Sequence, residues 1–471
     1  MTPRYDAILV TLLSVLLLAT NVSQAGDKPS IIFMLSDDQG WNGLSVAMHP
    51  EMAGSKEEIF HTPNLEKLAV QGMRFSSAYA PAPVCSPTRI SIQTGKSPAQ
   101  LHWTKAAPAV PGRKLIEPRL IKDLSKDEVT IGELLKQEGY ATAHYGKWHI
   151  AGGGPGAHGY DEHDGDTGNE NAFKFTDPNP VDIFGMAERA AKFMKKSKLA
   201  NKPFYIQLSW NALHAAELAN KATLAKYEKL ATNNSKQATI AAITEDLDSG
   251  VGKVLEAVDQ LGLSENTFII YMSDNGSGGG GGRRGGLSGG KGSVWEGGIR
   301  VPLIVRGPKV TANSWCHVPV VGYDFLPTLC ALAGVPAKEL PRDIEGGDIT
   351  SLLHNNGEGA VNRHREELVF HFPHYQSDDG PHSAIRLGDL KLIHFYEKDR
   401  VALFDLAKDI GERNDLAEQK PQDTQLLKGL LDQYLTAIDA QLPTPNPNFD
   451  PSQPIAPRKG GKYGKQGADK K

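Results

Sequence analysis

The chain has 471 residues, of which 39% are hydrophobic and 23% charged, the composition of an ordinary globular protein. Its length exceeds what one simple core supports, so we expect two domains. The formal net charge of −4 excludes the overall basic character of many nucleic-acid-binding proteins, and we expect no nucleic-acid partner.

The first 25 residues form a segment of their own. Arg4 precedes an apolar run over residues 8–19, and Ser23-Gln24-Ala25 follows with small residues at both ends. This order is typical of a secretory signal peptide. An uncleaved anchor is the alternative, but the run is short for a membrane span. We therefore expect cleavage after Ala25, no stable membrane anchor afterwards, and a secreted or periplasmic protein.

Apolar runs then alternate with amphipathic segments. Uninterrupted runs predict strands buried on both faces, as in a parallel sheet, and they cover residues 30–35, 140–145, 204–209, 267–272 and 301–305. Periodic segments predict helices at residues 62–69, 85–95, 130–139, 181–198, 237–261 and 323–333. Strands that alternate with helices predict an α/β fold with a mostly parallel sheet flanked by helices.

Cap residues mark several of these helices. Thr62 with Glu66 predicts an N-terminus with a partial capping box. Thr130 predicts a second N-cap. Gly95 and Gly139 predict helix ends, because glycine adopts the left-handed conformation found there.

The pattern changes near residue 365. Short strands at 368–372, 383–387 and 391–395 and a helix at 422–441 predict a smaller α+β domain. We therefore divide the chain into a catalytic α/β domain, 26–365, and a C-terminal subdomain, 366–441. Residues 442–471 are rich in Pro, Gly and Lys and are predicted to be disordered.

Cys85 opens the stretch Cys85-Ser86-Pro87-Thr88-Arg89, which we place at a helix start. Pro87 suits the first turn, where its missing N–H costs nothing. Unpaired N–H groups and the helix dipole make such a position an anion site. Arg89 lies one helical turn from Cys85. The alternative is a buried cysteine that acts as a small hydrophobic residue, and the local residues leave both open.

The other cysteines are Cys316 and Cys330. An odd number in an exported protein leaves at least one thiol free or modified. Cys330 lies in an apolar helix and is predicted to fill the core. A Cys316–Cys330 disulfide is the less favoured alternative.

Two predicted strands end alike, one in Asp37 and Asp38 and the other in Asp274 and Asn275. Ligands of open α/β sheets bind beyond the carboxyl ends of strands, so these side chains can converge. An all-oxygen set of this kind selects a hard cation, Ca²⁺ or Mg²⁺. Turn or cap residues are the alternative explanation.

Four further residues follow predicted strands or loops and are weak signals one by one: Lys147, His149, His214 and Lys291. Together they would surround a cation with positive and proton-transferring groups. Such a site suits a tetrahedral oxyanion ester.

The Cys85–Arg89 stretch, extended through Thr94-Gly95, resembles the formylglycine motif of type I sulfatases in the alkaline phosphatase superfamily. The resemblance runs over residues 29–416 and includes Ser36–Asp38, Gly146–His149, Ser273–Gly276, Lys291–Pro302 and Phe404–Asp409. It implies an alkaline-phosphatase-like α/β domain, a smaller C-terminal domain, one Ca²⁺, and conversion of Cys85 to formylglycine by a maturation enzyme. The hydrated aldehyde then carries two hydroxyls, one to attack sulfur and one to expel sulfate.

The resemblance also implies a role for each matching position. The Ca²⁺ ligands are Asp37, Asp38, Asp274, Asn275 and residue 85 as formylglycine. Arg89 and Lys147 hold the hydrate, and His149 is the base for sulfate release. His214 and Lys291 contact the sulfate and the leaving oxygen, either being the acid. The family often has His-x-Pro where this chain has His214-Ala215-Ala216, which leaves the role of His214 open.

We therefore expect an arylsulfatase-like hydrolase that cleaves a sulfate monoester, with a sulfated saccharide as substrate. The alternatives are a phosphomonoester or phosphonate-ester hydrolase of the same superfamily and a non-catalytic protein that binds sulfated glycans. Specificity is expected in loops at residues 42–60, 100–128, 150–180 and His371–Tyr375. For His371 and His374 themselves, partial burial at a strand end is slightly favoured over a role in specificity.

Overall fold

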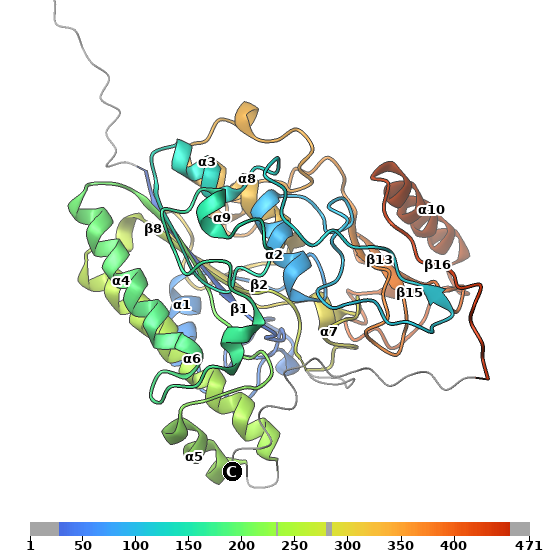
Figure 1. Ribbon diagram of the computed structural model, residues 1–471, viewed down its shortest axis with the longest axis horizontal. Helices are drawn as coiled ribbons and strands as arrows, with labels where there is room; N and C mark the ends of the chain where they lie inside the picture. Colours follow the sequence, from blue (N-terminus) through green and yellow to red (C-terminus); the bar gives the residue numbers. More distant parts are fainter. Residues whose placement is uncertain (1–27, 232–233, 279–284, 453–471) are drawn as a thin grey trace, which may run out of the picture.

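The computed structural model describes residues 28–231, 234–278 and 285–452 (Figure 1). The predicted signal peptide, and residues 453–471 of the predicted tail, lie outside the described residues. Within the described part, no helix is both long enough and apolar enough to cross a membrane.

An eight-stranded sheet forms the centre of the molecule, in the order β10-β2-β9-β8-β1-β7-β5-β6. Strand β9 runs antiparallel to both of its neighbours, and the other pairs are parallel. The strands of this sheet are β1 (Ser30–Ser36), β2 (Met73–Phe75), β5 (Ala141–Gly146), β6 (Glu162–His163), β7 (Phe204–Ser209), β8 (Thr267–Ser273), β9 (Leu303–Arg306) and β10 (Ser314–Cys316). The predicted mostly parallel α/β sheet is confirmed.

Helices cover both faces of this sheet (Figure 1). One face packs against α1 (Pro63–Gln71), α4 (Ile183–Leu199) and α6 (Ser235–Gln260). The other packs against α2 (Cys85–Thr94), α3 (Ile131–Gln137), α8 (Phe325–Ala333) and α9 (Thr350–His354). Two further helices of this domain are α5 (Lys221–Leu230), which packs on α6, and α7 (Glu296–Ile299).

The alternation of side chains along β1 explains why its sequence is apolar throughout. Ile32 and Met34 belong to the core on the α6 side, and Ile31, Phe33 and Leu35 to the core on the α2 side. Successive side chains of a strand point to opposite faces. A strand covered on both faces therefore has no exposed position.

The predicted helix ends at Thr62, Gly95, Thr130 and Gly139 are confirmed, but the capping box predicted at Thr62 is wrong. Thr130 and Glu133 form a full capping box at α3, and α2 ends at Gly95 with φ 70°. Thr62 precedes α1 but makes no side-chain cap. Its hydroxyl instead accepts from the backbone N–H of Ser45, and Glu66 accepts from the Ser45 hydroxyl. A tertiary contact thus replaces the local capping box.

A four-stranded antiparallel sheet follows, with the order β12 (Leu368–Phe372), β13 (His382–Leu387), β14 (Leu390–Phe395) and β15 (Arg400–Asp405). One face packs against residues of the large domain such as Tyr79 and Tyr323. The other packs against α10 (Pro421–Ala437). The prediction missed β15.

The start of the tail differs from the prediction of disorder. Strand β16 (Thr444–Pro445) pairs with β4 (Leu115–Ile116), and Asn446 donates from its backbone N–H to the Lys114 carbonyl. Strands β3 (Ala78–Tyr79) and β11 (Val320–Val321) form a further short pair.

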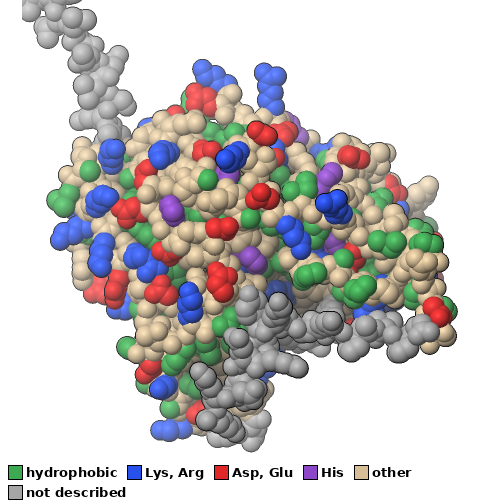
Figure 2. Space-filling view, viewed as in Figure 1, with side chains coloured by type: hydrophobic (Ala, Val, Ile, Leu, Met, Phe, Trp, Pro, Cys, Tyr) green, Lys and Arg blue, Asp and Glu red, His purple; other side chains and the backbone are tan. Residues whose placement is uncertain are grey.

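All three cysteines are buried and free, so the Cys316–Cys330 disulfide is absent. Over the face drawn in Figure 2, acidic and basic side chains are interspersed.

Candidate active site

The candidate site lies where four neighbouring parallel strands end. Strands β8, β1, β7 and β5 are adjacent in the sheet. Their last residues are in register, because Ser36 pairs with Ser273, and Ser209 pairs with both Leu35 and Gly146. The residues that follow these strands therefore meet at one edge of the sheet, as predicted.

Backbone geometry directs these residues into the site. Asp38 and His149 have φ values of 60° and 61°, a left-handed conformation that is uncommon for residues other than glycine and clusters at functional sites. Gly146 has φ 89°, and a side chain there would collide with the Ser209 carbonyl. Only glycine therefore allows β5 to turn into Lys147 against the end of β7.

Cys85 is the first residue of α2 and is 2% exposed, so the predicted helix start is confirmed. The preceding residue, Val84, offers no side-chain cap. Cys85 Sγ lies 3.4 Å from His149 Nδ1. The first turn of α2 thus brings its N–H groups and residue 85 to the strand ends.

Each of three buried carboxylates has a basic partner. Lys147 Nζ lies 2.6 Å from Asp37 Oδ2. Lys291 Nζ lies 2.6 Å from Asp38 Oδ1 and 2.8 Å from Oδ2.

Arg89 is the partner of Asp274. It donates from Nε and Nη2 to Asp274 Oδ2 at 3.0 and 2.7 Å, and from Nη1 to the Lys147 carbonyl at 2.7 Å. The guanidinium thus joins α2 to two strand ends.

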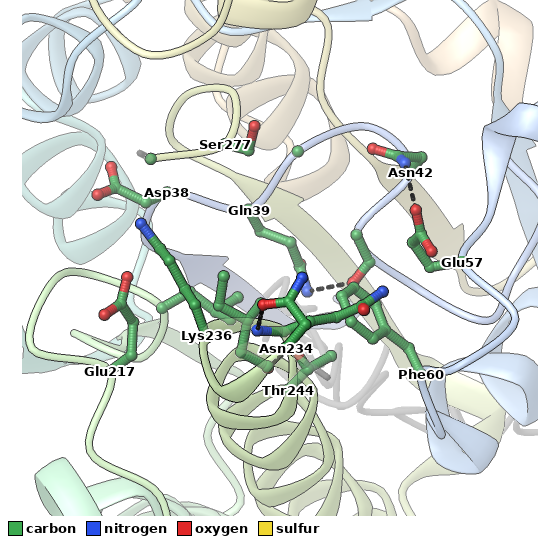
Figure 3. A pocket seen from close by; sticks show the side chains of 16 residues that line it. Asp38, Gln39, Asn42, Glu57, Phe60, Glu217, Asn234, Lys236, Thr244 and Ser277 are labelled. Carbon is green, nitrogen blue, oxygen red and sulfur yellow. Dashed lines mark hydrogen bonds between the residues drawn. The ribbon is translucent and has the colours of Figure 1, made fainter. Parts of the chain in front are cut away.

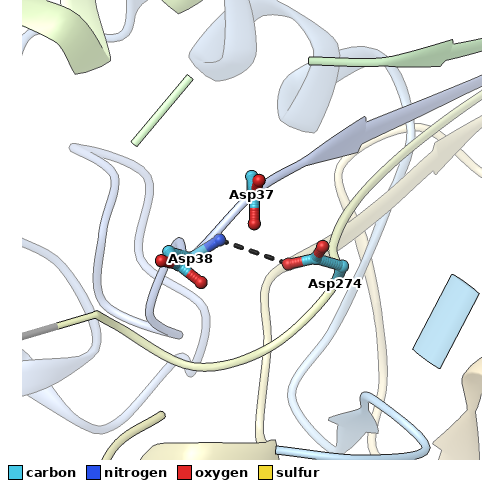
Figure 4. A group of neighbouring side chains, drawn as sticks. All are labelled: Asp37, Asp38 and Asp274. Atoms are coloured by element: carbon cyan, nitrogen blue, oxygen red, sulfur yellow. Dashed lines mark hydrogen bonds between the residues drawn. The ribbon is translucent and has the colours of Figure 1, made fainter. Parts of the chain in front are cut away.

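The carboxylates of Asp37, Asp38 and Asp274 also face one another (Figure 4). Each offers an oxygen, and these oxygens lie within 4.8 Å of one another. Asp37 Oδ1 and Asn275 Oδ1 are buried and have no hydrogen-bond partner in the part of the chain that the structure describes. Unpaired buried oxygens are rare, and a hard cation would satisfy both. The donor set thus fits the expected Ca²⁺, with Mg²⁺ as the alternative.

The carboxyl pKa values show how closely these charges lie. Burial, with the neighbouring charge of Asp37, raises the pKa of Asp274 to about 8. Burial also acts to raise the pKa of Asp37, but Lys147 and the other nearby basic groups outweigh it and hold that pKa well below its usual value. A cation between the two would favour the ionised form of both.

The basic groups act on the nucleophile position as well. Burial acts to raise the pKa of the Cys85 thiol, but Lys147 and Lys291 outweigh it and the pKa is lowered. Burial, together with Lys147 and Arg89, lowers the pKa of His149 well below its usual value. His149 is therefore a neutral imidazole at neutral pH.

Burial acts to lower the pKa of Lys291, but Asp38 and the other neighbouring negative groups outweigh it and raise that pKa. Lys291 is therefore a firmly held cation at the edge of the carboxylate cluster.

His214 lies beyond β7 and is partly exposed. Its Nδ1 lies 2.7 Å from the Ala215 carbonyl. A carbonyl only accepts, so Nδ1 carries the proton and Nε2 is the nitrogen left for a substrate. The peptide bond between Ala215 and Ala216 is cis.

Two pockets border this centre. The first, which we call the α6 pocket, has a volume of about 310 Å³ and lies between Asp38, Leu213 and the N-terminus of α6 (Figure 3). The second, the His149 pocket, has a volume of about 290 Å³ and includes Ser86, His149 and Lys122.

The structure also contains site features that the sequence analysis missed. The Thr167 carbonyl accepts from the backbone N–H of His149 at 2.7 Å and so fixes the loop after β5. No local pattern predicts this contact. The N-terminus of α6 could have been inferred, because the connection that follows β7 starts at the carboxyl edge of the sheet.

His371 and His374 do not line either pocket. His371 Nδ1 lies 2.7 Å from the Ser383 hydroxyl, and His374 Nδ1 lies 2.8 Å from Glu117. Both rings are buried. The prediction slightly favoured for them, burial at a strand end, is confirmed.

Comparison with known proteins agrees with the resemblance seen in the sequence. The family model described as Sulfatase matches residues 29–335, and the model described as N-sulphoglucosamine sulphohydrolase, C-terminal, matches residues 290–441.

Arylsulfatase A of Homo sapiens is 28% identical over 495 residues, with 90% of each chain covered. N-acetylgalactosamine-6-sulfatase of Canis lupus familiaris is 30% identical over 377 residues, covering 72% of this chain and 68% of the relative. Among solved structures, that of Ps i-CgsB superposes with a TM-score of 0.74 and 25% identity, covering 88% of this chain and 94% of the other.

Proposed function

This chain belongs to the type I sulfatases of the alkaline phosphatase superfamily and is a sulfuric ester hydrolase; on that premise we propose that it is an exported enzyme that removes sulfate from a saccharide. In this proposal residue 85 acts as a formylglycine hydrate and forms a covalent sulfo-enzyme intermediate. The maturation enzyme that converts Cys85 is then an obligatory partner. We also propose that the chain divides into a catalytic domain, residues 26–365, and a C-terminal subdomain, residues 366–441.

The observation that carries this proposal is a pair of buried oxygens, Asp37 Oδ1 and Asn275 Oδ1, that have no hydrogen-bond partner among the described residues. Asp37 lies close enough for its charge to act on the Cys85 thiol. The two oxygens indicate a hard cation, whereas a thiolate is a soft ligand. An oxygen species made from the cysteine suits that cation better than sulfur does. Formylglycine supplies a carbon with two hydroxyls, one to form the sulfate ester and one to expel it by re-forming the aldehyde.

The Ca²⁺ would be held by Asp37, Asp38, Asp274, Asn275 and the modified residue 85. It would lower the pKa of the attacking hydroxyl and offset the charge of the sulfate oxygens.

The basic groups position the reacting atoms. Lys147 and Arg89, held by Asp37 and Asp274, neutralise charge at residue 85. His149, whose Nδ1 lies 3.4 Å from Sγ, takes the proton of the hydroxyl that expels sulfate.

His214 and Lys291 lie on the leaving-group side, where either would protonate the departing alcohol. Lys291 is held by Asp38, and His214 presents Nε2. Both groups would also contact the sulfate oxygens.

The saccharide substrate is proposed from the relatives, since one of them is an N-acetylgalactosamine-6-sulfatase. Export is proposed from the predicted signal peptide.

Mass spectrometry of the tryptic peptide 75–89 from protein made with its maturation enzyme tests the modification. The expected peptide has lost one sulfur and two hydrogens and gained one oxygen. Sulfate release from a panel of sulfated mono- and oligosaccharides tests the activity. An active protein whose residue 85 is entirely unmodified cysteine would refute the formylglycine mechanism.

A further inference from the structure

The α6 pocket and the His149 pocket share no lining residue. The His149 pocket is lined by Ser86 and His149, which flank the nucleophile position, since His149 contacts Cys85 Sγ. The α6 pocket is lined by Asp38, Leu213 and Ser277. These residues adjoin the two groups proposed for the leaving oxygen.

Three contacts tie the α6 pocket to those groups. Asp38 accepts from Lys291 Nζ at 2.6 Å. The Ser277 carbonyl accepts from the Lys291 backbone N–H at 3.1 Å. Leu213 directly precedes His214, and Glu217, also in the lining, donates its backbone N–H to the His214 carbonyl at 3.0 Å.

Displacement at a tetrahedral oxyanion centre places the attacking and leaving oxygens roughly in line. The nucleophile stands at residue 85, on the His149 side. The leaving oxygen, and the alcohol that carries it, must then lie on the opposite side of the sulfur, toward Lys291 and His214. From this arrangement we infer that the sugar ring released by the enzyme binds in the α6 pocket and not in the His149 pocket, an inference that rests on the proposed function.

The lining of the α6 pocket suits a sugar ring. Its volume of about 310 Å³ lies at the lower end of small-ligand pockets, roughly 300–1,000 Å³, a size for one ring and not for an oligosaccharide. Phe60 and Leu213 provide apolar surface, and Asn42 and Gln237 provide amides. Apolar surface with a few convergent polar groups is the usual form of such a site.

Two lining residues at the N-terminus of α6 are open to a ligand. Lys236 is exposed and Gln237 is half-buried. Their side chains have no ion pair or hydrogen bond with any other described residue. Lys236 and Glu217 lie on the Asp38 side of the pocket, and Asn42 and Glu57 on the far side (Figure 3).

The chain offers a matched pair of lysines to test this. Lys236 lines the α6 pocket and Lys122 the His149 pocket, and both are exposed. The full-length enzyme, matured and loaded with Ca²⁺, is assayed on N-acetylglucosamine 6-sulfate, galactose 6-sulfate and 4-nitrophenyl sulfate, which lacks a sugar. The readout is the ratio of kcat/KM for the better saccharide to that for the aryl ester.

We expect Lys236→Ala and Gln237→Ala each to lower this ratio about three- to ten-fold, the effect of one lost hydrogen bond. Lys122→Ala should leave it unchanged. A lower ratio in Lys122→Ala alone, or an unchanged ratio in all three variants, would overturn the inference while the proposed function stands. Turnover of none of the esters by the wild-type enzyme would refute both.

Discussion

Replacing Arg89 by methionine tests whether its ion pair holds the centre together. The guanidinium is 2% exposed and its partner Asp274 is fully buried. The substitution removes both bonds to Asp274 and the bond to the Lys147 carbonyl, but keeps most of the side-chain volume. Removing one partner of a buried ion pair costs about 3–5 kcal/mol, because it leaves the other charge without compensation.

Urea unfolding followed by tryptophan fluorescence measures this cost in calcium-free protein at pH 9, above the pKa of about 8 that burial gives Asp274, so that the carboxylate is ionised. We expect Arg89→Met to unfold with a free energy lowered by about 3–5 kcal/mol. The deficit should shrink when Ca²⁺ is added, because the cation compensates Asp274. Activity should be lost in both conditions, since Arg89 also holds the hydrate.

Lys67→Ala is the matched control. Lys67 and Asp259 form an ion pair at 3.3 Å, with side chains 52% and 41% exposed, and such pairs contribute less than about 1 kcal/mol. If Arg89→Met unfolded as close to wild type as this control does, the buried pair could not be what joins α2 to the strand ends.

Further predictions concern the nucleophile, the metal and pH. Cys85→Ala should fold, still bind Ca²⁺ weakly and lose nearly all activity. Cys85→Ser should be nearly as inactive and should retain bound sulfate, because its sulfate ester has no second hydroxyl to expel it. Full turnover by either variant would refute the proposed chemistry. Removal of Ca²⁺ with a chelator should lower the thermal midpoint and abolish activity, both being restored by Ca²⁺, and an unchanged midpoint would contradict the metal site. Burial and Arg89 lower the pKa of His144 to about 3, so its contribution to stability is present above about pH 6.5 and is lost as the pH falls toward 3. Between pH 6.5 and 4.5, wild type should therefore lose about 2–3 kcal/mol more stability than His144→Leu, and equal losses would show that the ring is not held neutral.

The parts of the fold that the sequence predicts are those with long, continuous patterns. Strand β7 begins and ends where the apolar run does, and β1 and β8 extend one residue beyond theirs. Strands β2, β3, β10 and β11 have only two or three residues, too few to show a period. Their pairing depends on tertiary contacts, as does the pairing of β16 with β4.

The candidate site likewise has parts that local sequence patterns predict and parts that depend on tertiary contacts. The Ser-Asp pairs could be placed from the sequence, because parallel strands end at a common edge. Two contacts could not be predicted: the hydrogen bond from His149 to the Thr167 carbonyl and the one from the Ser45 hydroxyl to Glu66. Each involves a loop whose path no local pattern specifies. The α6 pocket is predictable only in part. The topology places the N-terminus of α6 at this edge of the sheet, but it does not predict which other residues line the pocket.

The charge of the centre bears on which ester it hydrolyses. Three carboxylates, Asp37, Asp38 and Asp274, face three cations, Lys147, Lys291 and Arg89, so the protein groups balance when all are ionised. One divalent cation raises the total to two positive charges.

A sulfate monoester with one negative charge and a nucleophile with another would make this centre neutral during reaction. A phosphate monoester dianion would leave one uncompensated negative charge in a buried site, which is costly. We therefore expect the matured enzyme to have a higher kcat/KM for 4-nitrophenyl sulfate than for 4-nitrophenyl phosphate. Asp38→Asn would add one positive charge and so should shift the ratio toward phosphate, provided that the variant keeps its Ca²⁺. A clear preference of the wild type for phosphate would show that the leaving-group and metal geometry, and not the charge count, decides the substrate.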